Sequence, residues 1–593
     1  MRLSFFDNYI LPIVLSLILI TPLITSAFTL ISKDIVFTFY FIVLCVFLLA
    51  IINCNLILKK SFFLDFNVID VLLFIITLYI GATFIFTTSN MSYINNYVLL
   101  TYSYLLYLIT KKTLRDNIHT LSVIFLIVGI IESLIRIWQL SKINYYHSEF
   151  SSLSINGSFG NSGLYSNFLA LVLPYALSLY LNRDQFNRKI TLISSTAIIL
   201  ITFILPFTSG RTSWIAAIGG CFYLIIRYMP KIDFKQLKIK LLFFLSFMFI
   251  IIPVGFLMYN YKENSALGRI LIYNVQLNII KDNFLFGIGF GKFEVIYNLY
   301  QAEYFISNPN SPYIYLASNI TKGFNEFLQI FVELGVIGLI LTLLVVLLLF
   351  TLKTTEKSVF LTTAKSSFIS IIICSCFSYP LRSLAITPAI IFIVSVISSH
   401  KPCIKKIDFL LCFKKRILIS VFVFLNIILI KVILKTKCAY LDWEKAINLA
   451  SNKRYSSALL IYDKVYPELK YDGYFLFDYG STILPINLYK GLEILERSKK
   501  YISHNNLYTY LGEAYSLTKN YKKAEYYYSL SSSIVPNRFY PRYRLFKIFI
   551  NNKQIKKAIL IGNQVKNMEI KVESIDVHIM QQEIIEWLKE NDN

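Results

Sequence analysis

Apolar blocks separated by short polar connections make up most of the first 436 residues. Each block is about 20 residues long, the length at which an α-helix crosses the hydrocarbon core of a membrane. The blocks lie near residues 10–30, 35–54, 67–87, 93–110, 119–140, 163–181, 190–207, 212–229, 239–259, 324–351, 359–379, 384–399 and 417–435. We therefore predict an all-α fold, in which a polytopic membrane bundle of about 12–13 transmembrane helices occupies residues 1–436.

The distribution of charge predicts how this bundle sits in the membrane. The chain is 56% hydrophobic, with a mean hydropathy of +0.60 and a formal net charge of +24. Its lysines and arginines gather in alternate connections, an enrichment typical of cytoplasmic loops. The N-terminus is then cytoplasmic, and the connections near 141–162, 208–212, 260–322 and 380–383 lie outside, as does everything after 436. Because the basic residues do not share one folded face, a nucleic-acid partner is excluded.

The outer connection at 260–322 is too long for a simple link, and such loops are usually functional. Its first part predicts a short helix over Arg269 to Ile280, which ends before the glycines of "GIGFG". A phosphate-cradling loop is one interpretation of Gly287, Gly289 and Gly291, but no strand-turn-helix unit surrounds them. We favour a tight turn that needs the backbone freedom of glycine.

Residues 437–593 form a polar, tyrosine-rich tail with helical periodicity. The segment 507–536 fits the tetratricopeptide pattern of about 34 residues. Its predicted packing residues are Tyr508, Leu511, Gly512, Tyr515, Tyr521, Ala524, Tyr528 and Pro536, with Tyr455, Ala458 and Tyr462 at the same spacing two repeats earlier. We predict a small α-solenoid whose concave face is a candidate site for a protein partner.

Charged and amide side chains gather where the outer loops meet the apolar blocks. Arg211, Arg269, Lys322, Glu326 and Arg382 all fall at this level. Each alone could be a headgroup anchor, but arginines that converge at one depth form an anion site suited to phosphate.

Two further polar residues near this level allow two interpretations each. Asn161 could bond a sugar hydroxyl or cap a helix, and Glu333 could pack a helix or handle a proton. CxxC and HExxH motifs are absent from the sequence, so we expect no metal site.

Four segments together resemble the O-antigen ligase and polymerase superfamily of integral-membrane glycosyltransferases of the C type. They are "GSFGNSGLYSNFLA" at 157–170, "TSGRTSWIA" at 208–216, "GRILIYNVQLNIIKDNFLFGIGFGKF" at 268–293 and "FNEFLQIFVELGVIG" at 324–338. The attached tail is similar to that of a subgroup common in Bacteroidetes-type bacteria. The resemblance implies transfer of a glycan from undecaprenyl diphosphate to an acceptor hydroxyl at the periplasmic face of the bacterial inner membrane, without metal or other cofactor. The acceptor would be lipid A–core or a similar lipid or glycan.

The resemblance also assigns roles to residues of this chain. Its histidine before Asn-Glu, the favoured base in ligases, is replaced here by Phe324, so we expect Glu326 to be the base and Asn325 to orient substrate. The donor diphosphate would be held by Arg211, Arg269, Arg382 and Lys322, and the glycan would be contacted by Asn161 and Glu333.

Several alternatives stay open at this level. Within the superfamily, a ligase is favoured over a polysaccharide polymerase or a protein O-oligosaccharyltransferase. A transporter of an anionic substrate could use the same arginines, although the sequence shows no clear inverted repeat. A non-catalytic scaffold for glycan assembly would explain Phe324 and would use the tail for recruitment.

Overall fold

The computed structural model describes residues 10–24, 33–58, 63–87, 94–143, 156–208, 210–228, 263–351, 358–408, 415–571 and 573–591. Over these ranges the chain is helical apart from one antiparallel ribbon, β1 (Phe63–Phe66) paired with β2 (Lys405–Asp408). The predicted all-helical fold is therefore confirmed for the described residues.

The helices of the membrane bundle follow the predicted apolar blocks. They are α2 (Leu11–Leu19), α3 (Lys33–Leu58), α4 (Val68–Thr87), α5 (Ile94–Ile143), α6 (Ser162–Leu181), α7 (Arg188–Ile204), α8 (Arg211–Tyr228), α12 (Glu326–Phe350), α13 (Val359–Phe377), α14 (Thr387–Ser399) and α16 (Lys415–Ser451). The predicted block at 239–259 lies outside the described residues. Helix α5 contains two predicted blocks, joined across non-helical backbone at Asn117.

Five described stretches are long and apolar enough to cross a membrane. They are Asp116–Ser141, Ser162–Leu181, Arg188–Phe207, Glu326–Phe350 and Val359–Phe377. These segments make the chain a multi-pass membrane protein, while the larger number of 12–13 spans stays a prediction.

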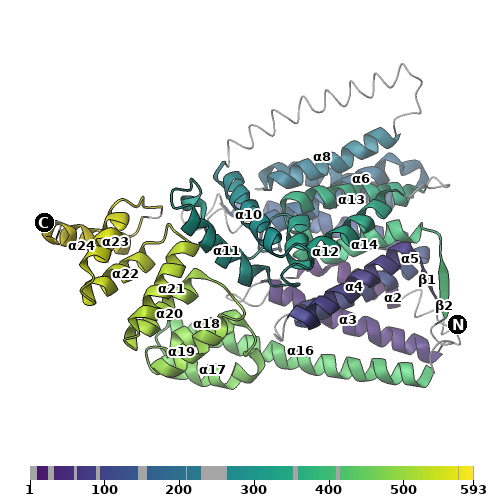
Figure 1. Cartoon of the computed structure of the whole chain (residues 1–593). Coiled ribbons are helices and arrows are strands. Elements are labelled where there is room, and N and C mark those ends of the chain that lie inside the picture. Colours follow the sequence, from purple (N-terminus) through teal and green to yellow (C-terminus); the bar gives the residue numbers. More distant parts are fainter. Residues whose placement is uncertain are drawn as a thin grey trace, which may run out of the picture.

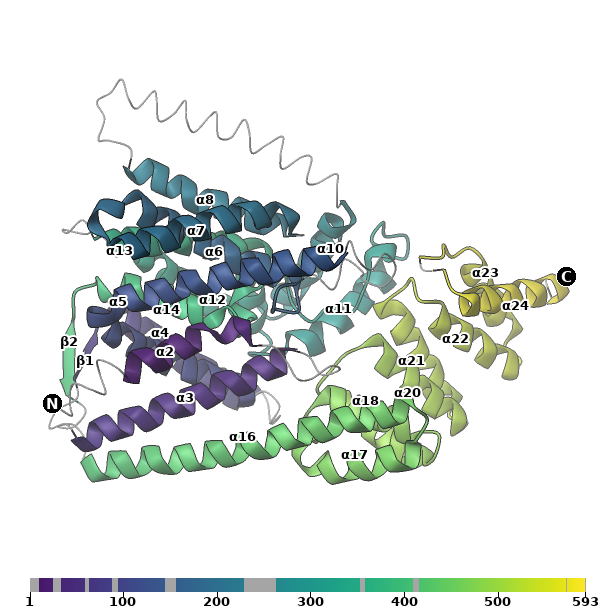
Figure 2. The ribbon, with the colours of Figure 1, turned by 180° about the vertical axis from the view of Figure 1, so that it is seen from behind.

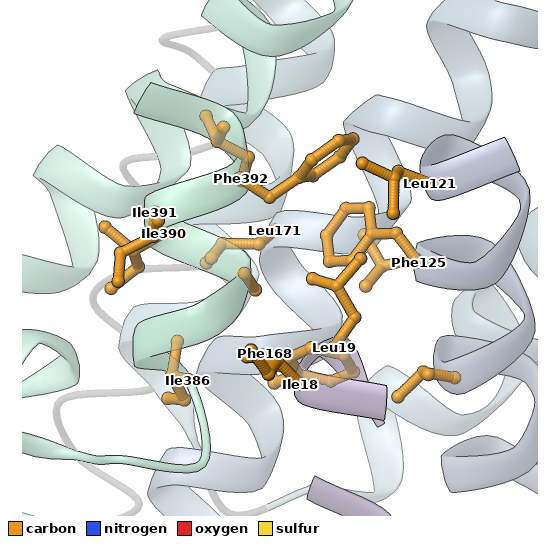
Figure 3. Packing of buried hydrophobic residues seen from close by; sticks show 14 of the residues in the cluster. Ile18, Leu19, Leu121, Phe125, Phe168, Leu171, Ile386, Ile390, Ile391 and Phe392 are labelled. Carbon is orange, nitrogen blue, oxygen red and sulfur yellow. The ribbon is translucent and has the colours of Figure 1, made fainter. Parts of the chain in front are cut away.

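The core of the bundle is apolar and rich in aromatic rings (Figure 3). Phe125 of α5 packs edge-on against Phe168 and Tyr175 of α6, with ring centroids 6.0 and 5.2 Å apart, and lies 5.7 Å from Phe392 of α14. Small polar residues join neighbouring helices, as where the Ser178 and Thr363 hydroxyls lie 2.7 Å apart. Close helix contacts and buried hydroxyl bonds of this kind stabilise bundles in lipid, where apolar burial alone does not.

The long loop contains α10 (Glu263–Asp282), α11 (Phe293–Ser307) and the short 3-10 helix η7 (Ile314–Leu316). The predicted helix from Arg269 is confirmed and begins six residues earlier. Gly287, Gly289 and Gly291 all have positive φ, at 70°, 101° and 82°, so the predicted glycine turn is also confirmed.

This glycine turn inserts into a break in α12. Gly335 has φ 66° and ψ −170°, and the helix bonds around it are replaced by bonds to the loop. The Ile288 and Gly289 amides donate to the Val332 and Glu333 carbonyls at 2.9 Å, and the Val336 amide donates to the Phe284 carbonyl at 2.9 Å. The backbone groups freed by the break are thus satisfied, which a membrane environment requires.

The tail consists of consecutive, mutually packed helices. They are α17 (Tyr455–Leu469), α18 (Gly473–Ile483), α19 (Leu488–Ser498), α20 (Asn505–Leu517), α21 (Tyr521–Ile534), α22 (Phe539–Asn551), α23 (Ile555–Lys566) and α24 (Ile575–Asn591). Lys453, Lys519 and Lys553 occupy the turns before α17, α21 and α23, each with φ between 56° and 59°. The same turn therefore recurs in three helix pairs.

Most of the predicted packing residues of the tail are buried. Ala458, Tyr462, Leu511 and Tyr528 are each at most 1% exposed. Tyr455 is 42% exposed, so its predicted packing position is wrong, because it begins α17 on the outer side of the turn.

The tail and the loop helices lie together at one end of the bundle, and the β1–β2 ribbon lies at the opposite end (Figures 1 and 2). Helix α16 packs against α3 and continues into the tail, so the predicted domain boundary at 436 falls inside this helix. The predicted orientation of the loop and the tail in the membrane stays a prediction.

Buried amides join the tail to the loop. Asn298 Nδ2 donates to the Ser503 carbonyl and Gln301 Nε2 to the Ile534 carbonyl, both at 2.7 Å. Asn537 Nδ2 lies 3.1 Å from the Tyr315 carbonyl. Since Asn298 and Gln301 are at most 1% exposed, these bonds are shielded from water and fix the loop on the tail.

Candidate functional site

Helix α12 begins at the predicted site. Asn325 is its N-cap, and Asn325 Oδ1 accepts a hydrogen bond from the Leu328 amide at 3.0 Å. This bond satisfies one of the free amides of the first turn, which is why Asn is favoured at such positions. Glu326 is the first residue of the helix and is 1% exposed. The substrate-orienting role of Asn325 stays a prediction.

Arg382, in the 3-10 helix η8 (Pro380–Arg382), joins two carboxylates of α12. Its Nε lies 3.3 Å from Glu326 Oε2, and its Nη1 and Nη2 donate to the two Glu333 oxygens at 3.3 and 3.1 Å. Glu326 Oε1 also accepts from the Leu381 amide at 2.9 Å. The guanidinium and the Leu381 amide thus fix the orientation of the Glu326 carboxylate.

The segment before α12 adopts a strained turn at Phe324, whose φ is +52°. A side-chain-bearing residue rarely takes this conformation, and it persists where the surroundings hold it. Tyr273 Oη donates to the Phe324 carbonyl at 3.1 Å, and Gln276 Nε2 donates to the Gly323 carbonyl at 2.8 Å. The Gly323 amide donates to Gln329 Oε1 at 2.8 Å, and Gln329 Nε2 donates to Glu333 Oε1 at 3.1 Å.

Three residues that the sequence pattern did not reveal make these bonds: two of them hold the turn, and Gln329 connects it to Glu333 of the Arg382 cluster. They are Tyr273, Gln276 and Gln329. The two glutamines are at most 2% exposed, and amides on otherwise apolar helix faces were the available signal.

The predicted cation Arg269 lies beside Phe324, and the charge of Arg211 acts on it. The Arg269 guanidinium lies 5.6 Å from the centroid of the Phe324 ring. Burial lowers the pKa of Arg269 below its ordinary value, Tyr273 opposes this shift, and the charge of Arg211 adds to it. Each of two neighbouring cations makes the charged form of the other less favourable, and an anion bound between them would stabilise both charged forms.

Asn161 and Phe324 both contact Tyr379. The Phe324 and Tyr379 rings meet edge-on with centroids 5.3 Å apart, and Asn161 Nδ2 lies 3.3 Å from Tyr379 Oη. Asn161 Oδ1 accepts from the Gly163 and Leu164 amides, so its predicted capping role is confirmed. Contact of Asn161 with a glycan stays a prediction.

A cavity of about 570 Å³ opens at this site and follows the membrane bundle. Lys322, Glu326 and Arg382 line it at the end next to the loop. Its walls follow α12 as far as Leu349, a length of about 35 Å at the rise of an α-helix. Apolar residues of α4, α5, α13 and α14 make most of the remaining wall, so charged groups meet a long apolar channel.

In the described part of the chain, no group of three or more His, Cys, Asp or Glu side chains could hold a metal ion. The expectation of metal-independent chemistry stays a prediction.

The structure brings several of the predicted site residues together. Lys322, Glu326 and Arg382 line one cavity, and Glu333 forms an ion pair with Arg382. The charge of Arg211 lowers the pKa of Arg269.

Comparison with known families identifies a partial match. Residues 196–343 match the model of the family described as O-antigen ligase (Wzy_C). This range contains Arg211, Arg269, Lys322, Asn325 and Glu326, whereas Asn161 and Arg382 lie outside it. The match supports glycan transfer of the ligase or polymerase type in general. No curated protein matches the chain.

Proposed function

We propose that this membrane protein transfers a glycan from a polyprenyl diphosphate, undecaprenyl diphosphate in bacteria, to the hydroxyl of an acceptor. The proposal rests on the match of residues 196–343 to the O-antigen ligase family and, above all, on one observation. A channel with apolar walls ends at the cluster of Lys322, Arg382 and Glu326. This arrangement suits a ligand with a long hydrocarbon tail and a charged head.

The channel supports a lipid-linked donor by its length and lining. A wall of about 35 Å accommodates a chain of many isoprene units, and each buried CH₂ stabilises binding by about 0.8 kcal/mol. Polar side chains such as Thr77 and Ser103 interrupt the wall at few places. A water-soluble sugar nucleotide has no group that would use such a channel.

We assign the donor diphosphate to Arg269, Arg211 and Lys322. Arg269 and Arg211 are within charge range of each other, and Lys322 lines the end of the channel. The guanidinium of Arg382 is engaged by two carboxylates, so we assign it a positioning role instead of the predicted diphosphate contact. Both carboxylate oxygens of Glu333 accept hydrogen bonds from Arg382. We therefore favour a role for Glu333 in positioning Arg382 over the predicted contact with the glycan.

In the proposed reaction, Glu326 takes the proton of the acceptor hydroxyl as that oxygen bonds to the anomeric carbon of the donor. The bond between this carbon and the diphosphate oxygen breaks, and the diphosphate leaves with the electron pair. The arginines and Lys322 stabilise the charge that develops on it. General-base assistance of this kind contributes a factor of about 10² to 10⁴ in rate.

We further propose that the reaction takes place at the periplasmic face of the inner membrane and that the tail is a tetratricopeptide solenoid. The recurrence of one turn at Lys519 and Lys553, 34 residues apart, supports the repeat. The bonds from Asn298 and Gln301 indicate that this solenoid holds the catalytic loop. A protein partner would bind the concave face.

Two neighbouring residues of α4 allow a matched test of the channel. Ile76 lines it, whereas Ile75 is 41% exposed on the outside of the bundle. Native mass spectrometry of the full chain with added undecaprenyl diphosphate measures the lipid bound. We expect Ile76→Trp to abolish binding and Ile75→Trp to retain it, and equal binding by both would reject the channel as the donor site.

A further inference from the structure

A second cavity, of about 200 Å³, lies between α10, α11 and the segment that carries η7 and Phe324. This space is many times what a single water molecule needs, so a small polar ligand such as one monosaccharide ring fits. Lys322 and Glu326 line the membrane channel, whereas Phe324 lines this second cavity. The five residues from 322 to 326 therefore border both cavities.

Gln301 lines this cavity, and its buried amide carries an unused hydrogen-bond acceptor. Gln301 is 0% exposed, and its Nε2 donates to the Ser318 carbonyl at 3.0 Å and to the Ile534 carbonyl at 2.7 Å. Two carbonyl partners fix which end of the amide carries the nitrogen. In the described part of the chain Gln301 Oε1 has no hydrogen-bond partner. A buried acceptor without a partner costs about 1–3 kcal/mol, so a donor from a ligand would stabilise it.

The remaining walls offer both donors and apolar surface. Arg269, Asn264 and Ser265 come from the first turns of α10, and Phe324 and Ile320 supply carbon surface on the other side. A sugar ring presents hydroxyls around its edge and C–H groups on its faces, so it matches this mixture. A phosphate ion would pair with Arg269, but its oxygens are acceptors and could not donate a hydrogen bond to Gln301 Oε1.

We propose that this cavity binds one sugar residue of the transferred or accepting glycan, with Gln301 Oε1 accepting a hydrogen bond from a sugar hydroxyl. The inference rests on the proposed glycan transfer. Because Ile534 belongs to the tail and holds the Gln301 amide, the tail is part of this subsite. The sugar belongs either to the donor glycan or to the acceptor, and kinetics separate the two sources.

Gly268 provides a variant that fills the cavity without disturbing the fold. It lines the cavity, and a Cβ placed on it meets no atom within 4 Å. Gly268→Met therefore fills the space while improving the helix propensity of α10 by close to the 1 kcal/mol that glycine costs. Gly268→Ala is the matched control, because it improves the helix and leaves the cavity mostly open.

A second pair of variants tests the amide itself. Gln301→Leu removes the acceptor and also the bond to the tail. Asn537→Leu breaks the bonds of another tail amide to the loop carbonyls of Ile314, Tyr315 and Ala317, and none of these residues lines the cavity. It therefore controls for loosening of the loop.

Binding is measured on the full chain in lipid nanodiscs by saturation-transfer difference NMR with free glucose, galactose, mannose, rhamnose and N-acetylglucosamine. We expect a signal from at least one sugar in wild type, Gly268→Ala and Asn537→Leu, and its loss in Gly268→Met and Gln301→Leu. Absence of a signal from every sugar in wild type, or an equal signal in Gly268→Met, would overturn the subsite. This readout does not need transfer, so it separates failure of the subsite from failure of the proposed function.

Transfer kinetics then identify the source of the sugar, with lipid-linked glycan and acceptor glycolipid extracted from a deletion strain. A KM raised tenfold or more in Gly268→Met for the acceptor alone assigns the subsite to the acceptor. The same rise for the donor alone assigns it to the donor glycan. Unchanged KM values for both substrates contradict the proposal even if transfer is normal.

Discussion

Arg382 Nε lies 3.3 Å from Glu326 Oε2, so the cation that the sequence assigned to the donor diphosphate instead holds the residue assigned as base. The same guanidinium reaches both oxygens of Glu333. A carboxylate oriented from two sides is a better-placed proton acceptor than a free side chain at a helix start. Because of this relationship we propose a positioning role for Arg382 and propose Arg269, Arg211 and Lys322 as the diphosphate contacts.

Removal of Arg382 is expected to destabilise the bundle as well as to impair transfer. Arg382→Met leaves Glu326 and Glu333 buried without their cation, a change that typically costs about 3–5 kcal/mol. We expect a lower thermal unfolding midpoint in detergent and partial recovery on addition of Glu333→Gln. Arg183→Met, at an exposed arginine, is the control and should melt like wild type. Equal midpoints for both arginine variants would show that the cluster is not structural.

Gly335 is expected to tolerate no side chain. Its backbone lies in a region that only glycine adopts readily, and a Cβ there would lie 2.1 Å from the Leu285 carbonyl oxygen. Gly335→Ala should therefore expel the glycine turn from the break in α12 and cost more than about 2 kcal/mol. Fluorescence-detected size exclusion should show aggregated Gly335→Ala and monodisperse Gly268→Ala. A monodisperse Gly335→Ala protein with a wild-type midpoint would refute the insertion.

Phe324→His separates an enzyme from a scaffold. Histidine adopts positive φ more readily than phenylalanine, so the turn held by Tyr273 and Gln276 should persist. Since Glu326 supplies the base in either protein, we expect transfer within a few-fold of wild type. A gain of about a hundred-fold or more, measured as glycolipid formed, would mean that the wild-type chain lacks a base.

The tail is expected to lose stability as the pH rises toward neutrality. Burial raises the pKa of Asp478 from 3.8 to about 7, and the nearby Trp443 side chain opposes the shift. The folded state therefore prefers the neutral acid, and this contribution is lost as the pH rises from about 4 through about 7. Hydrogen exchange of α18 and α19 in the full chain should accelerate between pH 5 and about 7.5 beyond the intrinsic chemical rate. Asp478→Asn should remove most of this dependence.

Asp463 provides a control because its pKa is shifted in the opposite direction to that of Asp478. Burial raises its pKa, but hydrogen bonds from Lys490 and Tyr479 outweigh burial and keep the pKa below the ordinary value. Asp463 therefore stabilises the fold above its unfolded pKa, and Asp463→Asn should weaken protection at neutral pH. Identical pH profiles for Asp478→Asn and wild type would contradict the account.

The sequence was sufficient to predict the helices and the residues at the start of α12. Apolar length fixes a span, and Asn325 before Glu326 is a recognisable helix start. The break at Gly335 was missed because one glycine within an apolar run looks like any other, and only insertion of the loop makes it necessary. The apolar pattern therefore locates a helix but not an interruption that a distant segment creates.

The polar network was missed for a related reason. Gln276 and Gln301 bond to segments distant in the sequence, Gln329 bonds to the turn that folds back just before its own helix, and an amide carries no periodic signal. Arg382 was identified as charged, but its partners depend on how η8 packs against α12. Docking of the loop on the tail is likewise a property of the fold and not of any local pattern.

The most direct measurement is made on a strain that lacks the gene, with wild type, Glu326→Gln and Arg269→Ala returned separately. Envelope glycolipid and undecaprenyl-diphosphate-linked glycan are resolved on gels from each strain. The account predicts that the deletion loses capped glycolipid and accumulates full-length lipid-linked glycan, and that wild type alone restores the profile. Accumulation of single-repeat glycan would indicate a polymerase instead of a ligase. An unchanged profile in the deletion would contradict transfer, and full rescue by both variants would contradict the site.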